Sequence, residues 1–440
     1  MDYAQALAYM QGLRRFGIKL GNDRFRALLE RLGDPHLRLR AVHVAGTKGK
    51  GSTTALVAAI LRAHGWRVGG YYSPYVYDVR ERVQVDGEMI APEEFARLVT
   101  RIAPHIEALA ATDQGSSTEF ELKTAAGFLH FAEAGVDFAA VEVGLGGRLD
   151  ATNVLQPLST VITNIGLDHT HILGDTHAKI AWEKAGIVKP GVPLVTAAEE
   201  PSALEVIRAV AAERGAPLTR VLAPGGPPPL PGECTVEVCG DEHAFAVCTP
   251  RRSYRDLRLG MLGGWQRINA GCAIAAVEDL AASAGFPVRE EAVRQALART
   301  ALPGRMEVAC RRPLVILDGA HNAMAAEALA AEIARFPVRR LLLVLGMVAG
   351  HDPEGVVQAL APLASRVYAT QPAWRRALPV ERIAQCARRW CPEVRSMAPP
   401  LEAARQALAD AHPEDLVLIT GSFYVVGDVP PSALLPLPVA

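Results

Sequence analysis

The sequence predicts an α/β protein of two domains, each built around a mostly parallel β-sheet. Short apolar runs rich in β-branched residues alternate with helical patterns, as in residues 41–46, 53–64, 138–143 and 159–166. This alternation is typical of parallel strands whose connecting helices cover both faces of a sheet. The 440 residues exceed the usual size of one domain and provide enough apolar material for two cores.

The domain boundary is expected near residue 301. Residues 222–250 hold a Pro/Gly cluster followed by alternating strands, which predicts an antiparallel extension on the first domain. Helices are expected over 265–284 and 290–299, and the turn-forming segment ALPGRMEV then begins a new unit. We therefore expect domains of residues 1–300 and 301–440, the second also alternating strands with helices.

Composition and charge exclude several classes of function. The net charge is −1, and aromatic residues are not interleaved with Lys/Arg runs, so we expect no nucleic-acid partner. No uncharged apolar run of membrane-spanning length and no apolar leader occur, which predicts a cytoplasmic protein without a membrane partner. The seven cysteines are irregularly spaced without a C-x-x-C pair, which favours reduced thiols over disulfides or zinc. Nothing in the sequence requires more than a monomer.

The stretch HVAGTKGKGS, beginning at residue 43, predicts a phosphate-binding loop between a strand and a helix. Gly46, Gly49 and Gly51 allow the backbone N–H groups to point inward, and the helix N-terminus adds positive potential. Lys50 supplies the mobile charge that a polyphosphate requires. The spacing departs from G-x-x-x-x-G-K-[ST], because the residue six before Lys50 is Val44. The alternative is an exposed Gly-Lys turn.

Acids and a histidine lie within or just after other predicted strands, and Glu142 lies within a strand that ends in a glycine turn. Glu142 and Asp150 flank the segment VGLGGRL, and Asp168 and His169 follow the strand STVITNIG. The carboxyl ends of parallel strands meet at the edge of the sheet where ligands bind, and carboxylates suit magnesium. Helix or turn capping and a buried core histidine are the alternatives.

Further candidates lie near a helix end and in the second domain. Lys184 reads from its position alone as a charge that complements a helix C-terminus. Arg305 stands beside a Pro-Gly turn, and Asp318, His321 and Asn322 follow the apolar strand PLVIL. These side chains could bind phosphate or ribose, with turn capping and a surface ion pair as alternatives.

In their order along the chain, these motifs resemble the dihydrofolate synthase/folylpolyglutamate synthase family of the Mur-ligase group. The matching blocks are HVAGTKGKGS, YSPYVYDVRERVQVDG, TEFELKT, EVGLGGRLDATN, LDHTHILGDT, EKAGIVKPG, LPGRMEV, LDGAHN, VLGMVAGHD and ITGSFYVVG. The family's loop is a shortened G-T-x-G-K-G-[ST], as read from Gly46 to Ser52. The resemblance implies a P-loop ATPase-type first domain and a smaller, Rossmann-like second domain.

The resemblance also implies roles for individual residues. ATP contacts are expected from Thr47, Lys48, Gly49, Lys50, Gly51, Ser52, Asn269, Arg305 and Asp318. Magnesium ligands are expected at Ser73, Glu142 and His169, and Lys184 matches a lysine that is carbamylated in family members. The pterin or folate is expected to contact Gly17, Ile18, Lys19, Thr118, Glu119, Phe120, Glu121, Leu149, Asp150 and Ala151. His321 is expected to take part in catalysis with the incoming glutamate.

The implied activity is ATP-dependent addition of L-glutamate to dihydropteroate, to the γ-carboxylate of a folate, or to both. ATP first converts the carboxylate to an acyl phosphate, and the glutamate amine then displaces phosphate. The expected cofactors are ATP and Mg²⁺, two ions in the family pattern, with K⁺ as a further candidate. The alternatives are a related ligase acting on a non-folate carboxylate and a non-catalytic P-loop regulator.

The chain departs from the family pattern at a few positions. Lys48 stands where Asn is commoner, Tyr75 where His often follows Ser-Pro, and Trp265 where His often precedes Gln. None of these changes removes a phosphate- or metal-binding group. Tyr75 and Trp265 lie near substrate-facing segments, so they bear on substrate preference rather than on the reaction.

Overall fold

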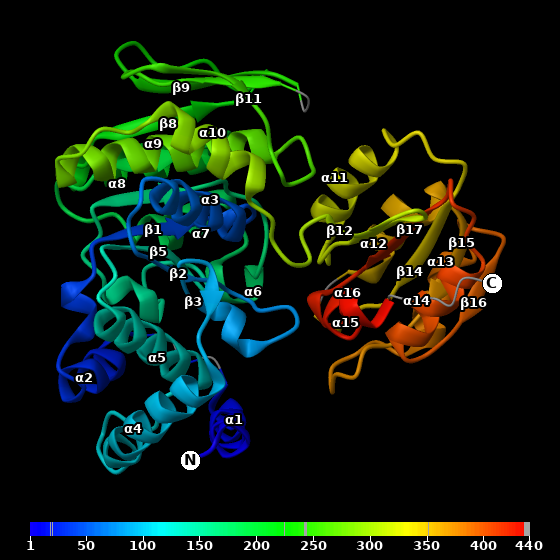
Figure 1. Cartoon of the computed structure of the whole chain (residues 1–440), viewed down its shortest axis with the longest axis horizontal. Coiled ribbons are helices and arrows are strands. Elements are labelled where there is room, and N and C mark those ends of the chain that lie inside the picture. The colour runs from blue at the N-terminus through cyan, green and yellow to red at the C-terminus, as the bar shows by residue number, and fades with distance from the viewer. Residues whose placement is uncertain (18, 20, 224, 242–243, 351, 435–440) are drawn as a thin grey trace. The chain divides into compact units, whose positions relative to one another are not determined.

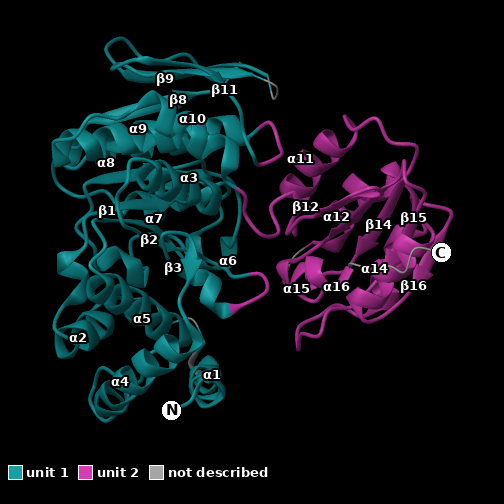
Figure 2. Cartoon of the chain, in the orientation of Figure 1, with its two compact units in different colours: residues 1–75, 79–260, 265–300 teal, residues 76–78, 261–264, 301–440 magenta. Residues whose placement is uncertain are grey.

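The chain folds into two compact units, shown in different colours in Figure 2. The computed structural model describes residues 1–17, 19, 21–223, 225–241, 244–350 and 352–434. Unit 1 comprises residues 1–75, 79–260 and 265–300, and unit 2 comprises residues 301–440 with the short segments 76–78 and 261–264. We expected both segments in the first domain. Tyr77 belongs to unit 2 because its hydroxyl donates to Glu307 at 2.7 Å, and Gly264 N donates to Glu332 Oε1 at 2.9 Å.

Unit 1 is organised around one large sheet (Figure 1). In the described part of the chain its strand order is β11-β10-β9-β8-β7-β6-β1-β5-β2-β3-β4. The strands are β1 (Ala41–Ala45), β2 (Val68–Tyr71), β3 (Val83–Val85), β4 (Glu88–Met89), β5 (Phe138–Glu142), β6 (Ser159–Ile162), β7 (Leu194–Thr196), β8 (Leu218–Leu222), β9 (Cys234–Gly240), β10 (Phe245–Cys248) and β11 (Ser253–Leu257). The strands between β2 and β9 pair in parallel, and antiparallel strands close both ends. The expected extension is therefore a continuation of the main sheet, because β9 pairs in parallel with β8.

Helices surround this sheet. They are α1 (Tyr3–Gly12), α2 (Asp23–Arg31), α3 (Lys50–Ala63), α4 (Pro92–Ala110), α5 (Glu119–Ala134), α6 (Thr170–Leu173), α7 (His177–Ala185), α8 (Pro201–Glu213), α9 (Gln266–Ala284) and α10 (Glu290–Arg299), with 3₁₀ turns η1 (Leu13–Phe16), η2 (Pro35–Arg38), η3 (Val79–Arg82) and η4 (Ala151–Val154). Helix α3 packs against α9, α10 and β5. It begins at Lys50, earlier than the pattern predicted, because the glycine loop leads directly into its first turn.

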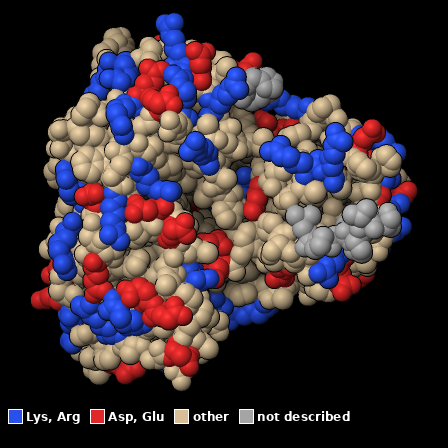
Figure 3. Space-filling view, in the orientation of Figure 1, with Lys and Arg blue, Asp and Glu red and all other residues tan. Residues whose placement is uncertain are grey.

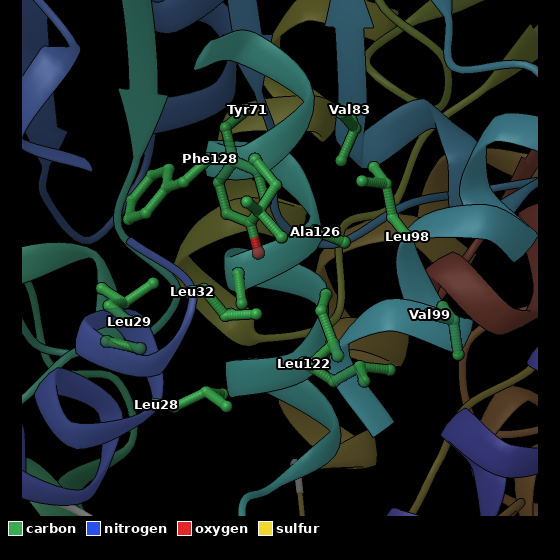
Figure 4. Packing of buried hydrophobic residues seen from close by; sticks show 14 of the residues in the cluster. Leu28, Leu29, Leu32, Tyr71, Val83, Leu98, Val99, Leu122, Ala126 and Phe128 are labelled. Atoms are coloured by element: carbon green, nitrogen blue, oxygen red, sulfur yellow. The ribbon is translucent and has the colours of Figure 1, made fainter. Parts of the chain in front are cut away.

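The core under α5 shows why these residues form a layer. Leu122, Ala126 and Phe128 on α5 are buried and pack with Leu28 of α2 and Tyr71 of β2 (Figure 4). Burying such side chains removes apolar area from water at roughly 25 cal/mol per Å². This packing fixes helix α5, whose first turn carries the predicted pterin-binding residues.

Unit 2 has a smaller sheet whose order in the described residues is β12-β13-β17-β14-β15-β16. The strands are β12 (Glu307–Arg311), β13 (Leu314–Leu317), β14 (Leu341–Leu345), β15 (Ala364–Ala369), β16 (Val394–Ser396) and β17 (Leu416–Thr420). The helical elements are α11 (Ala323–Ile333), α12 (Pro353–Leu360), η5 (Ala361–Leu363), α13 (Val380–Ala387), α14 (Pro400–Ala409), α15 (Phe423–Gly427) and α16 (Pro431–Leu434). All pairs except β12–β13 are parallel, which confirms the predicted α/β class.

The surface carries charges of both signs. Figure 3 shows acidic and basic side chains interspersed over the visible face, in keeping with the net charge of −1. No helix in the described part of the chain is long and apolar enough to cross a membrane.

Candidate active site

The glycine loop connects β1 to α3 in a backbone conformation that requires glycine. Gly46 and Gly49 have φ of +147° and +81°. A Cβ on Gly46 would lie 1.9 Å from Thr163 Oγ1, and one on Gly49 would lie 2.3 Å from Asn269 Oδ1. These glycines therefore allow close approach as well as positive φ. The loop ends at the N-terminus of α3, where N–H groups lack intrahelical partners and favour anions.

Residues that follow β6 hold the loop in place. Thr47 N donates to Asn164 O at 2.9 Å, and Lys48 N donates to Asn164 Oδ1 at 2.8 Å. Thr163 Oγ1 donates to Lys48 O at 2.5 Å. Neither Thr163 nor Asn164 was predicted as a site residue, although their position directly after an apolar strand was a usable signal. Their bonds fix the backbone on which Lys48 and Lys50 stand.

Two lysines converge on one carbonyl of the loop. Lys50 Nζ donates to Gly46 O at 3.0 Å and Lys184 Nζ donates to the same oxygen at 2.8 Å. Lys184 is only 4% exposed. Its burial, and then the nearby charge of Lys50, hold the pKa of its amine well below the ordinary value. The position-based reading of Lys184 as a surface charge is therefore wrong, because α7 directs it at the loop.

Lys48 forms an ion pair with Asp168, at 3.0 Å between Nζ and Oδ2. Asp168 Oδ1 also accepts from His169 N at 2.9 Å. His169 has a left-handed backbone, φ 49°, and its side chain is 44% exposed. The second positive charge of the loop is thus directed at the segment after β6. His169 lies beside Asp168 within the same segment.

Glu142 and Ser73 meet at the ends of β5 and β2. Ser73 N donates to Glu142 Oε2 at 2.8 Å, and Glu142 is 2% exposed. This carboxylate lies 3.3 Å from where a Cβ on Gly51 would be. No three His, Cys, Asp or Glu side chains converge as metal ligands within the described residues. The expected magnesium ligands, Glu142, His169 and Ser73, combine one acid, one imidazole and one hydroxyl. A buried carboxylate beside a phosphate-type loop fits a divalent cation, because oxygen donors suit such ions.

The predicted pterin-binding residues of α5 lie in a charged setting. Thr118 caps α5 in a capping box with Glu121, and Glu121 pairs with Arg24 at 2.8 Å. Glu119 pairs with Arg14 at 3.1 Å and with Lys123 at 2.9 Å. Burial, followed by the charge of Arg82, lowers the pKa of Lys123 to about 7. None of these cations was selected from the sequence.

Tyr75, one of the departures from the family pattern, lies in the same setting. Arg14 Nη2 donates to its hydroxyl at 3.4 Å, and the Arg82 guanidinium lies 5.6 Å from its ring centroid. Tyr75 therefore contacts the cationic side chains that lie next to α5.

The other predicted pterin-binding segments lie beside α5. Lys19 Nζ donates to Ser116 O at 3.3 Å, just before α5 begins, and Gly21 N donates to Leu149 O at 3.5 Å. Gly17 has φ +60° and ends η1. Ile18 lies outside the described residues. A Cβ on Gly144 would lie 2.4 Å from Phe120 Cζ and 3.0 Å from Asp150 Oδ2, so Phe120 and Asp150 meet there.

Asp150, Ala151 and Asn269 are buried. Asp150 caps η4 by accepting from Thr152 N, which was the alternative role predicted for it. The same side chain also lies near Phe120, so capping does not exclude a pterin contact. Ala151 is the first residue of η4. Asn269 Nδ2 donates to Gln266 Oε1 at 2.8 Å, and its Oδ1 faces Gly49. Ser52 is buried in the first turn of α3.

Unit 2 brings its own predicted residues together. Asp318 follows β13 and accepts from Met306 N at 2.9 Å and from Ala320 N at 2.8 Å. The guanidinium of Arg305 lies 4.3 Å from the centroid of the Phe423 ring, and the His321 ring lies 6.2 Å from it. His321 Nδ1 donates to Gly319 O at 2.8 Å, because a carbonyl can only accept. Phe423, within ITGSFYVVG, was not selected from the sequence.

Comparison with known proteins decides the family. The Mur ligase middle domain matches residues 44–277, and the Mur ligase glutamate ligase domain matches residues 304–423. A Bacillus subtilis dihydrofolate synthase/folylpolyglutamate synthase is 38% identical, over 97% of this chain and 98% of the relative. The chain belongs to the dihydrofolate synthase/folylpolyglutamate synthase family. As a member of this family of Mur ligases, it is an enzyme of the ligase class.

Solved structures of this synthase family have the same fold. Escherichia coli FolC in complex with DHPP and ADP superposes with a TM-score of 0.85 at 32% identity, covering 97% of this chain and 96% of that one. A bifunctional folylpolyglutamate synthase/dihydrofolate synthase with Mn, AMPPNP and L-glutamate bound has a TM-score of 0.82 at 31% identity, covering 97% of each chain. The fold of this synthase family is thus present over 97% of the chain.

Proposed function

We propose that the chain is an ATP-dependent ligase that adds L-glutamate to dihydropteroate, to the γ-carboxylate of a reduced folate, or to both. The observation that carries the proposal is the convergence of Lys50 and Lys184 on Gly46 O, in a phosphate-type loop beside the buried Glu142. Membership of the synthase family and the E. coli structure in complex with DHPP and ADP support the choice of substrates.

The reaction follows from what a carboxylate and an amine need. An oxygen of the pterin carboxylate attacks the γ-phosphorus of ATP, and ADP leaves. The glutamate nitrogen then attacks the acyl carbon, the amide bond forms, a proton is lost, and phosphate departs with the attacking oxygen. Lys50 and the N–H groups at the start of α3 offset the charge of the phosphates. A divalent ion held by Ser73, Glu142 and His169 would supply further charge neutralisation there.

We assign the remaining predicted residues by the same reasoning. The predicted ATP contacts in unit 1 are Thr47 to Ser52 and Asn269, and those in unit 2 are Arg305 and Asp318. His321 acts on the glutamate amine, since its Nδ1 proton is committed to Gly319 O and Nε2 is the nitrogen that accepts a proton. Residues 1–300 thus hold ATP and pterin, and residues 301–440 serve the glutamate. This division remains a prediction.

Lys184 is proposed to be carbamylated. Burial lowers the pKa of its amine and so favours the uncharged nitrogen, which attacks CO₂, forms an N–C bond and releases one proton. The resulting carboxylate lies beside the loop and would hold a second magnesium ion. The relative with Mn, AMPPNP and L-glutamate bound supports ATP and a divalent cation. The second ion, K⁺, a monomeric state and a cytoplasmic location stay predictions.

The pterin is proposed to contact residues 17–19, 118–121 and 149–151. Their convergence at the first turn of α5 favours a pterin ligase over a related ligase with a non-folate carboxylate substrate. Phosphate release from ATP distinguishes the possibilities when purified protein receives glutamate with either dihydropteroate or tetrahydrofolate. We expect release that depends on a pterin and on glutamate. Release without either pterin would contradict the folate assignment, and no release at all would favour a non-catalytic nucleotide-binding protein.

A further inference from the structure

A chain of buried side chains leads from the central strand β1 to Asp150. His43 lies on β1 and is fully buried. Its Nε2 lies 2.8 Å from Thr152 Oγ1, and Thr152 Oγ1 lies 2.6 Å from Asp150 Oδ1. Asp150 is a predicted pterin contact, whereas neither His43 nor Thr152 was selected from the sequence. The chain therefore links a core residue to the proposed substrate site.

The direction of these hydrogen bonds follows from proton counting. A carboxylate only accepts, so the single hydroxyl proton of Thr152 is committed to Asp150. Thr152 Oγ1 must then accept from His43, which places the imidazole proton on Nε2. His43 Nδ1 is buried and has no hydrogen-bond partner among the described residues, as expected for the unprotonated nitrogen. Burial, and then the charge of Lys189, lower the pKa of His43 to about 3, so the ring stays neutral.

Asp150 is surrounded by donors. Thr152 N donates to Oδ1 at 2.9 Å, and Leu145 N donates to Oδ2 at 2.8 Å. Burial raises the pKa of the Asp150 carboxyl, and these donors oppose that rise by stabilising the charged form. The Thr152 hydroxyl, polarised by His43, adds a short hydrogen bond to the same carboxylate. These donors fix both the orientation of Asp150 and its place beside Phe120.

We propose that His43 is a positioning residue that acts through Thr152 to orient the Asp150 carboxylate for pterin recognition. This inference rests on the proposed function, because it takes Asp150 as a pterin contact. His43 itself lies inside the sheet and touches no reacting atom. The expected effect of removing it is therefore a loss of pterin affinity rather than a loss of phosphoryl transfer.

Matched variants test the role of each bond. His43→Leu removes the donor, whereas His43→Gln keeps an N–H near the Nε2 position. Thr152→Val removes the hydroxyl at nearly constant shape, whereas Thr152→Ser keeps it. We expect His43→Leu and Thr152→Val each to raise KM for dihydropteroate about tenfold, with kcat and KM for ATP changed less than about twofold. The Gln and Ser variants should recover most of the affinity.

A double variant separates positioning from a general effect on the fold. In an Asp150→Asn background, His43→Leu should add less than about a twofold loss of dihydropteroate affinity, because its target is already altered. Losses that add fully, or an equal loss of ATP affinity, would overturn the proposal. So would an unchanged KM for dihydropteroate in both His43→Leu and Thr152→Val.

The tautomer of His43 gives a readout that needs no substrate. With ¹⁵N-histidine labelling, assigned by difference from His43→Gln, Nε2 should carry the proton and Nδ1 should not, at neutral and mildly acidic pH. In Thr152→Val this preference should weaken, because Nε2 loses its acceptor. A proton on Nδ1 in the wild type would overturn the proposed hydrogen bond from His43 to Thr152. This measurement does not depend on catalysis. If the protein bound no pterin, the proposed function would be contradicted, but the tautomer of His43 would still test its hydrogen bond to Thr152.

Discussion

Lys184 Nζ donates a hydrogen bond to Gly46 O at 2.8 Å, and Lys50 Nζ donates to the same oxygen at 3.0 Å. Two ammonium groups that share one carbonyl repel each other, and Lys184 is the more deeply buried of the two. The pair therefore divides its tasks. Lys50 is proposed to contact phosphate, and the burial of Lys184 favours the neutral amine that is able to react with CO₂.

Replacing Lys50 with Ala should reduce pterin-dependent phosphate release by about 100- to 1,000-fold, because a preorganised charge at the transferring phosphoryl group is lost. The matched control is Lys179→Ala. Lys179 is an exposed residue of α7 that pairs with Asp175. The control should keep activity within about twofold. Initial rates and circular dichroism of both variants provide the check, and retained activity in a folded Lys50→Ala protein would contradict the phosphate role.

Activity should depend on bicarbonate if Lys184 is carbamylated. Protein prepared and assayed without CO₂ should lose most of its activity and recover it when bicarbonate is added. Lys184→Met should be inactive at any bicarbonate concentration, because it has no amine. Electron density of an active crystal offers a second test, in which an unmodified Lys184 would count against the carbamate.

Gly49→Ala should weaken ATP binding as well as the fold. The left-handed φ of +81° costs a β-carbon about 1–2 kcal/mol, and the new Cβ would meet Asn269 Oδ1 at 2.3 Å. Gly215→Ala is the control, since Gly215 has φ +58° and open space around its Cβ position. Both variants should lose stability in thermal unfolding, but only Gly49→Ala should raise KM for ATP. Equal KM values in both would contradict the close contact with Asn269.

Glu233 should make unit 1 more stable above pH 4.5 than below. Burial raises the pKa of this carboxyl, but hydrogen bonds from Arg208 at 2.6 Å and Arg220 at 2.9 Å outweigh burial and lower it to about 2. A folded pKa below the unfolded value stabilises the protein above the unfolded pKa, and this contribution is lost as pH falls towards 2.

Glu233→Gln should therefore cost about 2 kcal/mol near neutral pH and approach the wild-type stability near pH 2. Thermal unfolding as a function of pH measures the difference. Glu213→Gln is the control, because Glu213 is 73% exposed and lies 3.8 Å from its partner Arg214. A difference between Glu233→Gln and wild type that did not change with pH would refute the assigned ion pair.

Local patterns predicted the fold well where helix and strand periods were clean. The helix over 290–299 has those bounds in the structure, and both the strand that contains Glu142 and the strand that precedes Thr163 are present. Periodicity does not report on pairing, however. The continuation of the sheet through β9 to β11 depends on a parallel register with β8, and the assignment of residues 76–78 to unit 2 depends on Tyr77 meeting Glu307.

The candidate site was predictable where motifs carry it and not where long-range contacts do. Gly46, Lys50 and Glu142 stand in recognisable sequence contexts. The pairing of Lys48 with Asp168, which the sequence left open, joins residues 120 positions apart. Lys184 reads as a surface charge from its place at a helix end, and only tertiary packing shows that its amine is buried at the loop.

The most direct test of ligation through an acyl phosphate follows one oxygen atom of the substrate carboxylate. Dihydropteroate or tetrahydrofolate labelled with ¹⁸O in the reacting carboxylate is incubated with the protein, ATP and L-glutamate, and the products are analysed by mass spectrometry. We predict a pterin product that is heavier by one glutamyl residue, together with inorganic phosphate that carries one ¹⁸O atom. Unlabelled phosphate, or the absence of a glutamylated product from both pterins, would contradict ligation through an acyl phosphate.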